Sequence, residues 1–174
     1  IVDGRIHPAR IEETVEKDIA FGPKNMGLSD TEIKERVIRA AEFTGLSEEM
    51  LGKSPFELSG GQKRRVAIAG SLAMEPDILV LDEPAAGLDP RGKNEILGHL
   101  CEYQKKRGNT LVIISHSMED IASMADKIIV MNKGRVAMEG TPDEIFLRGD
   151  ELINMGLDIP EVTKICNSLI EKGY

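Results

Sequence analysis

Hydrophobic and polar positions follow two different patterns along the chain, and each pattern predicts one kind of element. Ile33, Val37 and Ala40 recur at helical spacing with charged side chains between them, which predicts an amphipathic helix. In contrast, "ILVL" at residues 78–81 and "LVII" at 111–114 are short unbroken apolar runs. Such runs are typical of strands that are buried on both faces of a parallel sheet. The alternation of these strands with helices predicts an α/β fold, in which right-handed crossovers link the parallel strands.

Capping residues and helix breakers set the ends of the predicted elements. Ser29 followed by Glu32 is a capping box, which opens a helix that runs to about Phe43. The glycines and the proline of "AFGPKNMG" at residues 20–27 predict a break in any regular element there. The same signals predict the remaining elements, which are a strand with an Asp-Gly turn in residues 1–11, a short helix in 44–55, a helix from Ser59 to Pro76, a helix from about Arg91 to Arg107, a helix capped by Ser117 and Asp120, a hairpin turning at Asn132–Gly134, a helix opened by Thr141 and Glu144, and a last helix with an apolar stripe at Val162, Ile165, Cys166, Leu169 and Ile170.

Composition narrows the class of protein. A chain of 174 residues is long enough for one well-buried core and a small appendage. Its net charge of −8 and its aromatic content of 3% argue against a nucleic-acid partner, because both a basic surface and stacking platforms are lacking. Two isolated cysteines indicate a reducing compartment. Since no apolar run is long enough to span a membrane, we expect a cytoplasmic location and membrane contact only through a protein partner.

Polar residues follow both apolar strands at their carboxyl ends, where ligands bind in open α/β sheets. Asp82 and Glu83 come after the first strand, and Ser115 and His116 come after the second. An aspartate at such a position can hold Mg²⁺, and a glutamate beside it can deprotonate an attacking water. The competing interpretation is a pair of solvated acids that begins a turn.

A second group of candidate residues lies at the start of the helix that follows residue 58. The candidates are Ser59, Gly60, Gly61 and Gln62. Glycines at a helix start leave the backbone N–H groups open to close approach by an anion, which the helix dipole also favours there. Ser59 adds a hydroxyl donor. For the Ser-Gly-Gly triplet alone, an ordinary serine N-cap is the favoured interpretation, and the basic run at 63–65 is by itself typical of a solvated helix face.

The order and spacing of these segments resemble the nucleotide-binding domains of ABC ATPases. Leu58–Gln62 matches the signature motif of that family, Ile78–Glu83 its Walker B motif, Gly87–Asp89 its D-loop and His116 its switch histidine. The resemblance implies a P-loop NTPase type of α/β core that binds ATP and Mg²⁺. The implied roles are Mg²⁺ support for Asp82, catalytic base for Glu83, γ-phosphate contact for His116, communication across a dimer for Asp89, and contact with the ATP of the other subunit for Ser59, Gly60, Gly61 and Gln62.

Three longer segments are similar to the ATPases of energy-coupling factor importers, which serve vitamins and cobalt or nickel ions. They cover residues 13–33, 64–84 and 156–165, and the second, A-prime type of ATPase matches best. Ala85 departs from the threonine that is usual after Glu-Pro. The likeness implies a head-to-tail dimer with a second ABC ATPase, expected to be a heterodimer, a transmembrane coupling subunit, a substrate-binding membrane subunit, and a peripheral position on the cytoplasmic face of the cell membrane.

The largest departure from the family lies at the front of the chain. No glycine-rich phosphate loop that ends in Gly-Lys-Ser or Gly-Lys-Thr is present, because the Gly-Lys-Ser triplet at 52–54 has Ser47 where the first glycine of such a loop would stand. The adenine-stacking aromatic and the Q-loop glutamine are also missing before Glu12. We therefore expect these 174 residues alone to show no appreciable ATPase activity. The expected domains are a remnant strand at 1–11, a helical subdomain at 12–57, the ATPase core at 58–140 and a C-terminal helical extension at 141–174.

Two other functions remain open at this point. The chain is a catalytically inactive interaction module if it only offers its signature motif to an intact partner. It is also compatible with an ABC ATPase outside transport, as in DNA repair or translation. The helical subdomain and the short C-terminal extension argue against that last class, because in transporters this subdomain receives the membrane subunit.

Overall fold

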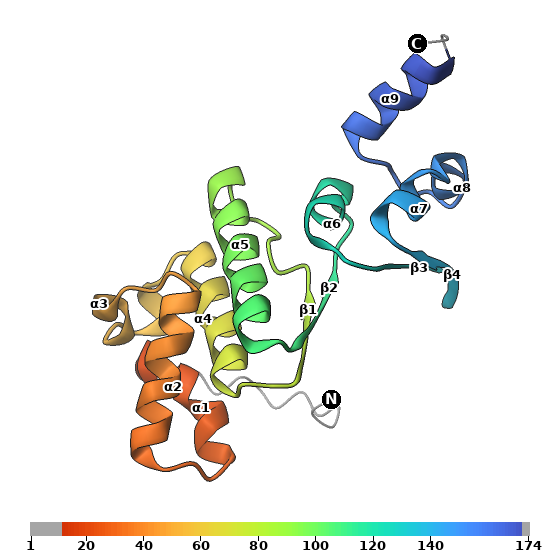
Figure 1. The fold of residues 1–174 in the computed structure, drawn as a ribbon. Helices are drawn as coiled ribbons and strands as arrows, with labels where there is room; N and C mark the ends of the chain where they lie inside the picture. Colours follow the sequence, from red (N-terminus) through yellow and green to blue (C-terminus); the bar gives the residue numbers. More distant parts are fainter. Residues whose placement is uncertain (1–11, 172–174) are drawn as a thin grey trace. The chain divides into compact units, whose positions relative to one another are not determined.

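The structure is a computed structural model that describes residues 12–171 of the chain (Figure 1). The chain divides into two compact units between residues 113 and 114. The strand and turn predicted within residues 1–11 lie outside the described residues. The described part mixes helices with a parallel strand pair, so the predicted α/β class is confirmed. The finer boundaries expected at 57/58 and 140/141 remain predictions.

A helical bundle makes up the first half of the N-terminal unit. Helices α1, α2 and α4 pack against one another in pairs. The predicted stripe of α2 is buried, and its capping box is formed, because the Ser29 Oγ accepts from the Glu32 N–H and the Glu32 carboxylate accepts from the Ser29 N–H. The bundle consists of α1 (Val15–Asn25), α2 (Asp30–Phe43), α3 (Glu48–Leu51), a 3₁₀ turn (Pro55–Glu57) and α4 (Gly60–Ala73).

The break predicted at Gly22 and Pro23 is wrong, because α1 continues through both residues as far as Asn25. The break predicted at Gly27 agrees with the structure, since the helix has ended before this glycine, which has a left-handed φ of 74°. Pro23 lies in the last turns of the helix and is buried in the bundle. Gly22 faces α4 so closely that a Cβ placed on it would lie 2.6 Å from the Met74 Cγ. Close packing against α4 therefore overrides the local preference of Gly-Pro to end a helix, and the glycine is what permits the approach.

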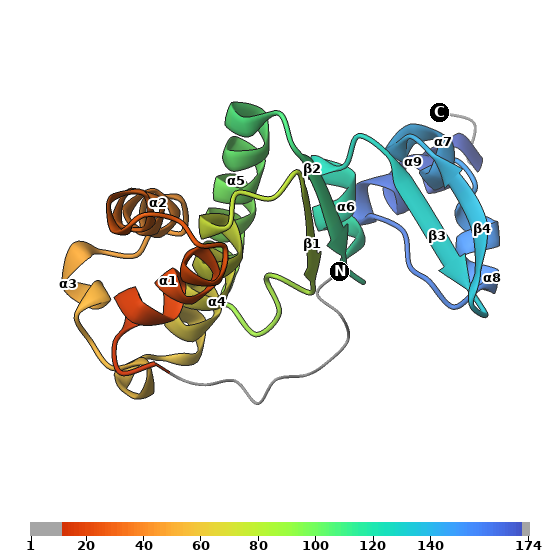
Figure 2. The ribbon, with the colours of Figure 1, turned by 90° about the horizontal axis from the view of Figure 1, so that it is seen from below.

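Two strands follow the bundle and lie side by side (Figures 1 and 2). β1 (Ile78–Asp82) pairs with β2 (Thr110–Ile114), and α5 (Pro90–Arg107) connects them. α5 ends as predicted at Gly108, which has the left-handed φ of 67°. Asn109 ties the turn before β2 to the segment before β1, since its side-chain amide donates to the Pro76 carbonyl.

The expectation that both strands are buried on both faces is wrong. Leu79 is buried, but its neighbours Ile78 and Val80 are 62% and 58% exposed, and Ile114 on β2 is 52% exposed. Successive side chains of a strand point to opposite faces. Within residues 12–171 only one face of the β1–β2 pair is covered, so every second apolar side chain remains open to solvent.

The C-terminal unit is built around a hairpin with helices packed on it. β3 and β4 are antiparallel and turn at Lys133 and Gly134, both at positive φ, as the sequence predicts. Met118, Ile128, Val130, Met138, Ile145, Phe146, Leu152 and Ile159 form its core. The unit contains α6 (Met118–Met124), β3 (Ile128–Asn132), β4 (Arg135–Gly140), α7 (Pro142–Phe146), α8 (Gly149–Asn154) and α9 (Glu161–Glu171).

Candidate functional site

The start of α4 carries the glycine-rich group of predicted site residues. Ser59 is the N-cap, and its Oγ accepts from the Gln62 N–H at 3.3 Å while the Gln62 Oε1 accepts from the Ser59 N–H at 2.9 Å. Because the Ser59 oxygen acts as acceptor in this bond, its hydroxyl hydrogen can still point to a ligand. The serine N-cap and the anion-binding interpretation are therefore compatible in one geometry.

The two glycines of this helix start have different surroundings. A Cβ placed on Gly60 would meet no atom within 4 Å, so the space in front of this backbone is open. A Cβ on Gly61 would lie 3.1 Å from the Leu88 Cδ2. Gly60 thus allows a ligand to approach the first N–H groups of a 14-residue helix, which have no partner within the helix. Gly61 lets the helix start lie against the segment that follows β1.

The acidic pair lies at the carboxyl end of β1. Asp82 is the last residue of the strand and its side chain is exposed, whereas Glu83 is half-buried. Glu83 has a φ of +48°, a left-handed conformation that is strained for a residue with a Cβ. The Ala86 N–H donates to the Glu83 carbonyl at 3.1 Å and closes a tight turn. The turn therefore presents two consecutive carboxylates directly after the strand.

Arg64 links this turn to α4. Its Nε donates to the Pro84 carbonyl and its Nη2 donates to the Asp82 carbonyl, both at 3.1 Å. Arg65 beside it donates to the Thr44 carbonyl at 2.9 Å and pairs with Glu95 at 2.8 Å. The interpretation of residues 63–65 as a solvated face is therefore wrong for both arginines. The sequence did not predict these contacts. The helical periodicity shows on which face of α4 the arginines lie, but it does not show which backbone segments pack against that face.

Asp89 caps α5, and its side chain accepts from the Gly92 N–H at 3.1 Å. Gly87 at φ 76° and Leu88, whose N–H donates to the Ala85 carbonyl, form the connection between the acidic turn and this cap. Asp89 thus has a local structural task in the single chain. The role expected for it across a dimer remains a prediction.

His116 lies two residues beyond β2 and is exposed. It belongs to the C-terminal unit, whereas Asp82 and Glu83 belong to the N-terminal unit. The structure therefore brings together the start of α4, the acidic turn and the cap of α5, and the part expected of His116 remains a prediction.

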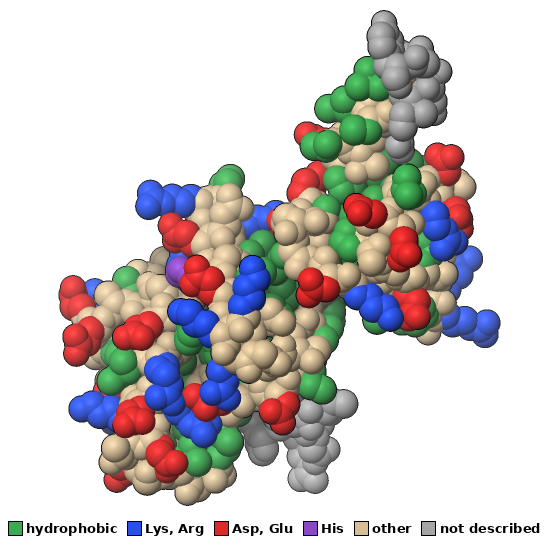
Figure 3. Space-filling view, viewed as in Figure 1, with side chains coloured by type: hydrophobic (Ala, Val, Ile, Leu, Met, Phe, Trp, Pro, Cys, Tyr) green, Lys and Arg blue, Asp and Glu red, His purple; other side chains and the backbone are tan. Residues whose placement is uncertain are grey.

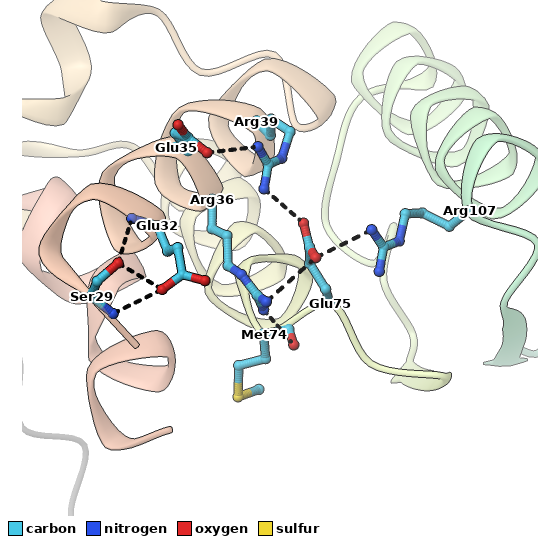
Figure 4. Close-up of polar contacts among 8 residues, drawn as sticks. All are labelled: Ser29, Glu32, Glu35, Arg36, Arg39, Met74, Glu75 and Arg107. Carbon is cyan, nitrogen blue, oxygen red and sulfur yellow. Dashed lines mark hydrogen bonds and ion pairs between the residues drawn. The ribbon is translucent and has the colours of Figure 1, made fainter. Parts of the chain in front are cut away.

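Glu75 is the centre of an ion-pair network that sequence reasoning missed (Figure 4). Its carboxylate pairs with Arg36 at 3.6 Å, with Arg39 at 3.0 Å and with Arg107 at 3.2 Å. Arg36 also donates to the Met74 carbonyl at 3.3 Å. The network joins α2, the turn between α4 and β1, and the last turn of α5. It holds the bundle against the α5–β1 layer that carries the acidic turn.

Charge, apolar length and the arrangement of metal-binding side chains give three further observations. On the face drawn in Figure 3, acidic and basic side chains are interspersed over the helices of the N-terminal unit. Within residues 12–171 no helix combines the length and the apolar character that a membrane span requires. Over the same residues, no group of three or more His, Cys, Asp or Glu side chains is arranged to hold a metal ion. A Mg²⁺ that takes most of its ligands from phosphate oxygens and waters does not need such a group.

Comparison with protein families agrees with this geometry. Residues 6–86 match the family model described as "ABC transporter", and that range contains both the helix start at 59–62 and the acidic pair at 82–83. The fold and the site therefore define an ABC-type ATPase domain.

Individual relatives narrow the family further. The chain is 57% identical over 162 residues to the energy-coupling factor transporter ATP-binding protein EcfA2 of Caldanaerobacter subterraneus, and 54% identical over 164 residues to EcfA2 of Clostridium tetani. These matches cover 93% and 94% of this chain and 57% of each relative. The chain belongs to the ABC transporter ATPases, and the predicted resemblance is confirmed. It spans about 57% of the length of these curated relatives.

Solved structures give the same result. cbiO1 from Clostridium perfringens, described as part of the ABC transporter complex cbiONQ, has a TM-score of 0.72 at 40% identity, covering 91% of this chain and 63% of its own. The dimeric cassette MJ0796, a bacterial ABC transporter cassette, has a TM-score of 0.67 at 26% identity, covering 79% and 61%. The described fold is therefore that of an ABC cassette.

Proposed function

We propose that the protein binds and hydrolyses ATP to power an energy-coupling factor importer of a vitamin or of cobalt or nickel ions. The names of the relatives support the transporter class, and one solved neighbour holds ADP and phosphate in a dimeric cassette. The observation that carries the proposal is the acidic turn of Asp82 and Glu83, which Arg64 holds beside the glycine start of α4. One chain thus presents both an anion-binding helix end and a pair of carboxylates.

Each proposed residue has a task that follows from its chemistry. Asp82 is exposed at the end of β1 and would hold Mg²⁺, which neutralises phosphate charge when bound. Glu83 accepts the proton of the attacking water. Ser59, Gly60, Gly61 and Gln62 offer a hydroxyl and backbone N–H groups to the γ-phosphate of an ATP held by a second subunit. His116 donates a hydrogen bond to the γ-phosphate, and Asp89 communicates between the two subunits of the dimer.

The proposed dimer follows from the assignment of the helix start and the acidic turn to two different ATP molecules. A helix start that serves the ATP of another subunit requires a head-to-tail partner, and we propose a second, related ABC ATPase in a heterodimer. A transmembrane coupling subunit would receive the helical subdomain, and a separate membrane subunit would bind the imported substrate. The protein would then lie peripherally on the cytoplasmic face of the cell membrane.

Replacement of Glu83 by Gln in the full-length protein, assembled with its transporter, tests this function. We expect ATP hydrolysis to fall about 100-fold or more, because the proton acceptor is lost, while ATP still binds. Glu151→Gln is the matched control, since this exposed glutamate of α8 pairs with Arg148, the residue that precedes the helix. The measurements are phosphate release and binding of labelled ATP. Unchanged hydrolysis in Glu83→Gln would contradict the proposed base and favour the alternative of an interaction module.

A further inference from the structure

The two carbonyl groups that Arg64 binds stand on either side of Glu83. The guanidinium donates to Asp82 on one side and to Pro84 on the other, each at 3.1 Å. Arg64 belongs to the first turns of α4, five residues after Ser59. One side chain of the glycine-start helix therefore brackets the residue to which we assign the proton transfer.

The bracketed residue needs such support because its backbone is strained. Glu83 adopts a φ of +48°, which a residue with a Cβ adopts only when the surrounding structure enforces it. Hydrogen bonds between an ionised donor and a backbone carbonyl are stronger than neutral ones, and the planar guanidinium holds two acceptors in a fixed relative position. Arg64 thus opposes relaxation of the turn at two peptide groups, Asp82–Glu83 and Pro84–Ala85, which lie before and after Glu83.

A second contact ties the same two segments together. The backbone of Gly61 lies so close to Leu88 that even a Cβ would approach its Cδ2 to 3.1 Å. Arg64 contacts the turn before residue 85, and Gly61 contacts the segment after it. The start of α4 and the acidic turn are therefore held as one body by contacts at both ends of the connection to α5.

We infer that Arg64 is a positioning residue that couples the anion-binding start of α4 to the orientation of Glu83. The inference rests on the proposed function, in which the helix start and Glu83 serve two different ATP molecules of one dimer. In this inference Arg64 acts through its hydrogen bonds to the Asp82 and Pro84 carbonyls and takes no part in the chemistry. When the start of α4 moves, Arg64 moves the turn that carries the Glu83 carboxylate with it. One chain thereby couples the two ATP sites of the dimer.

Three variants of the full-length protein in its assembled transporter test the inference, and they are Arg64→Ala, Arg64→Lys and the matched control Arg148→Ala. Arg148 is exposed, belongs to the C-terminal unit and pairs with Glu151 three residues further along the chain. We expect kcat for ATP to fall about 10- to 100-fold in Arg64→Ala with KM changed less than about twofold, because a misplaced catalytic group costs rate and not binding. The kcat of Arg64→Lys should lie between those of Arg64→Ala and the control, since an ammonium group reaches one carbonyl and lacks the two parallel donors of a guanidinium.

A measurement that needs no turnover accompanies the kinetics. Amide hydrogen exchange of residues 82–88 without nucleotide should be faster in Arg64→Ala than in the control, because the amides of Ala86 and Leu88 close this turn. Exchange and kcat equal to those of Arg148→Ala would overturn the inference. If Arg64→Ala does not fold, as judged by its melting curve, the result for Arg64→Lys decides in the same way.

The two proposals fail differently. If the wild-type protein does not hydrolyse ATP, or if Glu83→Gln hydrolyses it normally, the proposed function is wrong and hydrogen exchange alone judges Arg64. If Glu83→Gln is inactive while both Arg64 variants match the control in kcat and in exchange, the function stands and the coupling is wrong.

Discussion

The helical bundle of α1, α2 and α4 and the strand pair β1–β2 bury their apolar residues to very different degrees. Ile19 on α1 and Val37 on α2 are 0% and 2% exposed. In β1 and β2 the apolar runs are as strong in sequence, yet Val80 and Ile114 are more than half exposed. The same residue types thus close a core in one region and remain open in the other.

The difference follows from the number of faces that each kind of element must cover. An amphipathic helix has one apolar stripe, and the neighbouring helices of a contiguous segment can bury it. A strand with apolar residues at every position has two apolar faces and needs a layer on each. Within the described residues, the bundle supplies its own partners, whereas the β1–β2 pair has a layer on one face only.

The largest expected effect compares one isoleucine from each region. Ile19→Ala should lower the free energy of unfolding by about 2–5 kcal/mol, because it leaves a cavity in a closed core. Ile78→Ala should cost less than about 1 kcal/mol, because the side chain is 62% exposed and little apolar surface returns to water. Denaturant titrations of both variants provide the values. Equal losses would show that the exposed strand face is covered in solution.

An intermediate effect is expected at the network that joins the two regions. Glu75→Gln should destabilise the chain by about 1–2 kcal/mol, because three arginines then surround a neutral side chain that is only 17% exposed. Glu139→Gln is the matched control, since its pair with Lys127 is 60% exposed on both sides and should contribute less than about 0.5 kcal/mol. Thermal melting checks both. A loss no larger than that of the control would mean that the bundle stays docked without the network.

The smallest effect concerns the cap of α2 and its dependence on pH. Ser29→Ala should cost roughly 1 kcal/mol, because the Glu32 N–H loses its acceptor. Hydrogen bonds from Ser29 lower the pKa of the Glu32 carboxyl. A lowered folded-state pKa means that this stabilisation is present above the ordinary pKa of glutamate and is lost as the pH falls through the folded value.

The difference between wild type and Ser29→Ala should therefore shrink in acid, which urea titrations at pH 7 and at pH 3 would reveal. The same substitution at Ser71 is the control, because this serine lies in the interior of α4 and bonds the Ala67 carbonyl of its own helix. A difference that is independent of pH would contradict the link between the cap and Glu32.

Four of the predictions that rest on local chemistry agree with the structure. The capping boxes at Ser29 and Thr141, the stop of α5 at Gly108 and the hairpin turn at Lys133–Gly134 all form where the residues predict them. Each depends on groups within four residues of one another, so the neighbouring sequence contains the whole interaction.

Two predictions failed because the structure there depends on a neighbour distant in sequence, and they are the break at Gly22 and Pro23 and the solvated face at Arg64. α1 continues through Gly22 and Pro23 because Met74, more than fifty residues away, packs on it. Arg64 is a link and not a solvated side chain because the Asp82–Pro84 turn happens to face α4. Hydrophobic periodicity identifies neither Met74 nor the Asp82–Pro84 turn as a partner. It shows which face of a helix is apolar, but it does not show which segment packs against a face.

The sequence by itself determined the class of this protein and the identity of the candidate residues, because motif order and chemistry are properties of the chain. Tertiary structure alone decided how those residues are held. It set the strained backbone of Glu83, the two carbonyls that Arg64 bridges, and the open space before Gly60 beside the filled space before Gly61. The physical reason is that strain, close approach and the direction of a hydrogen bond depend on which segments the packing of the core brings together.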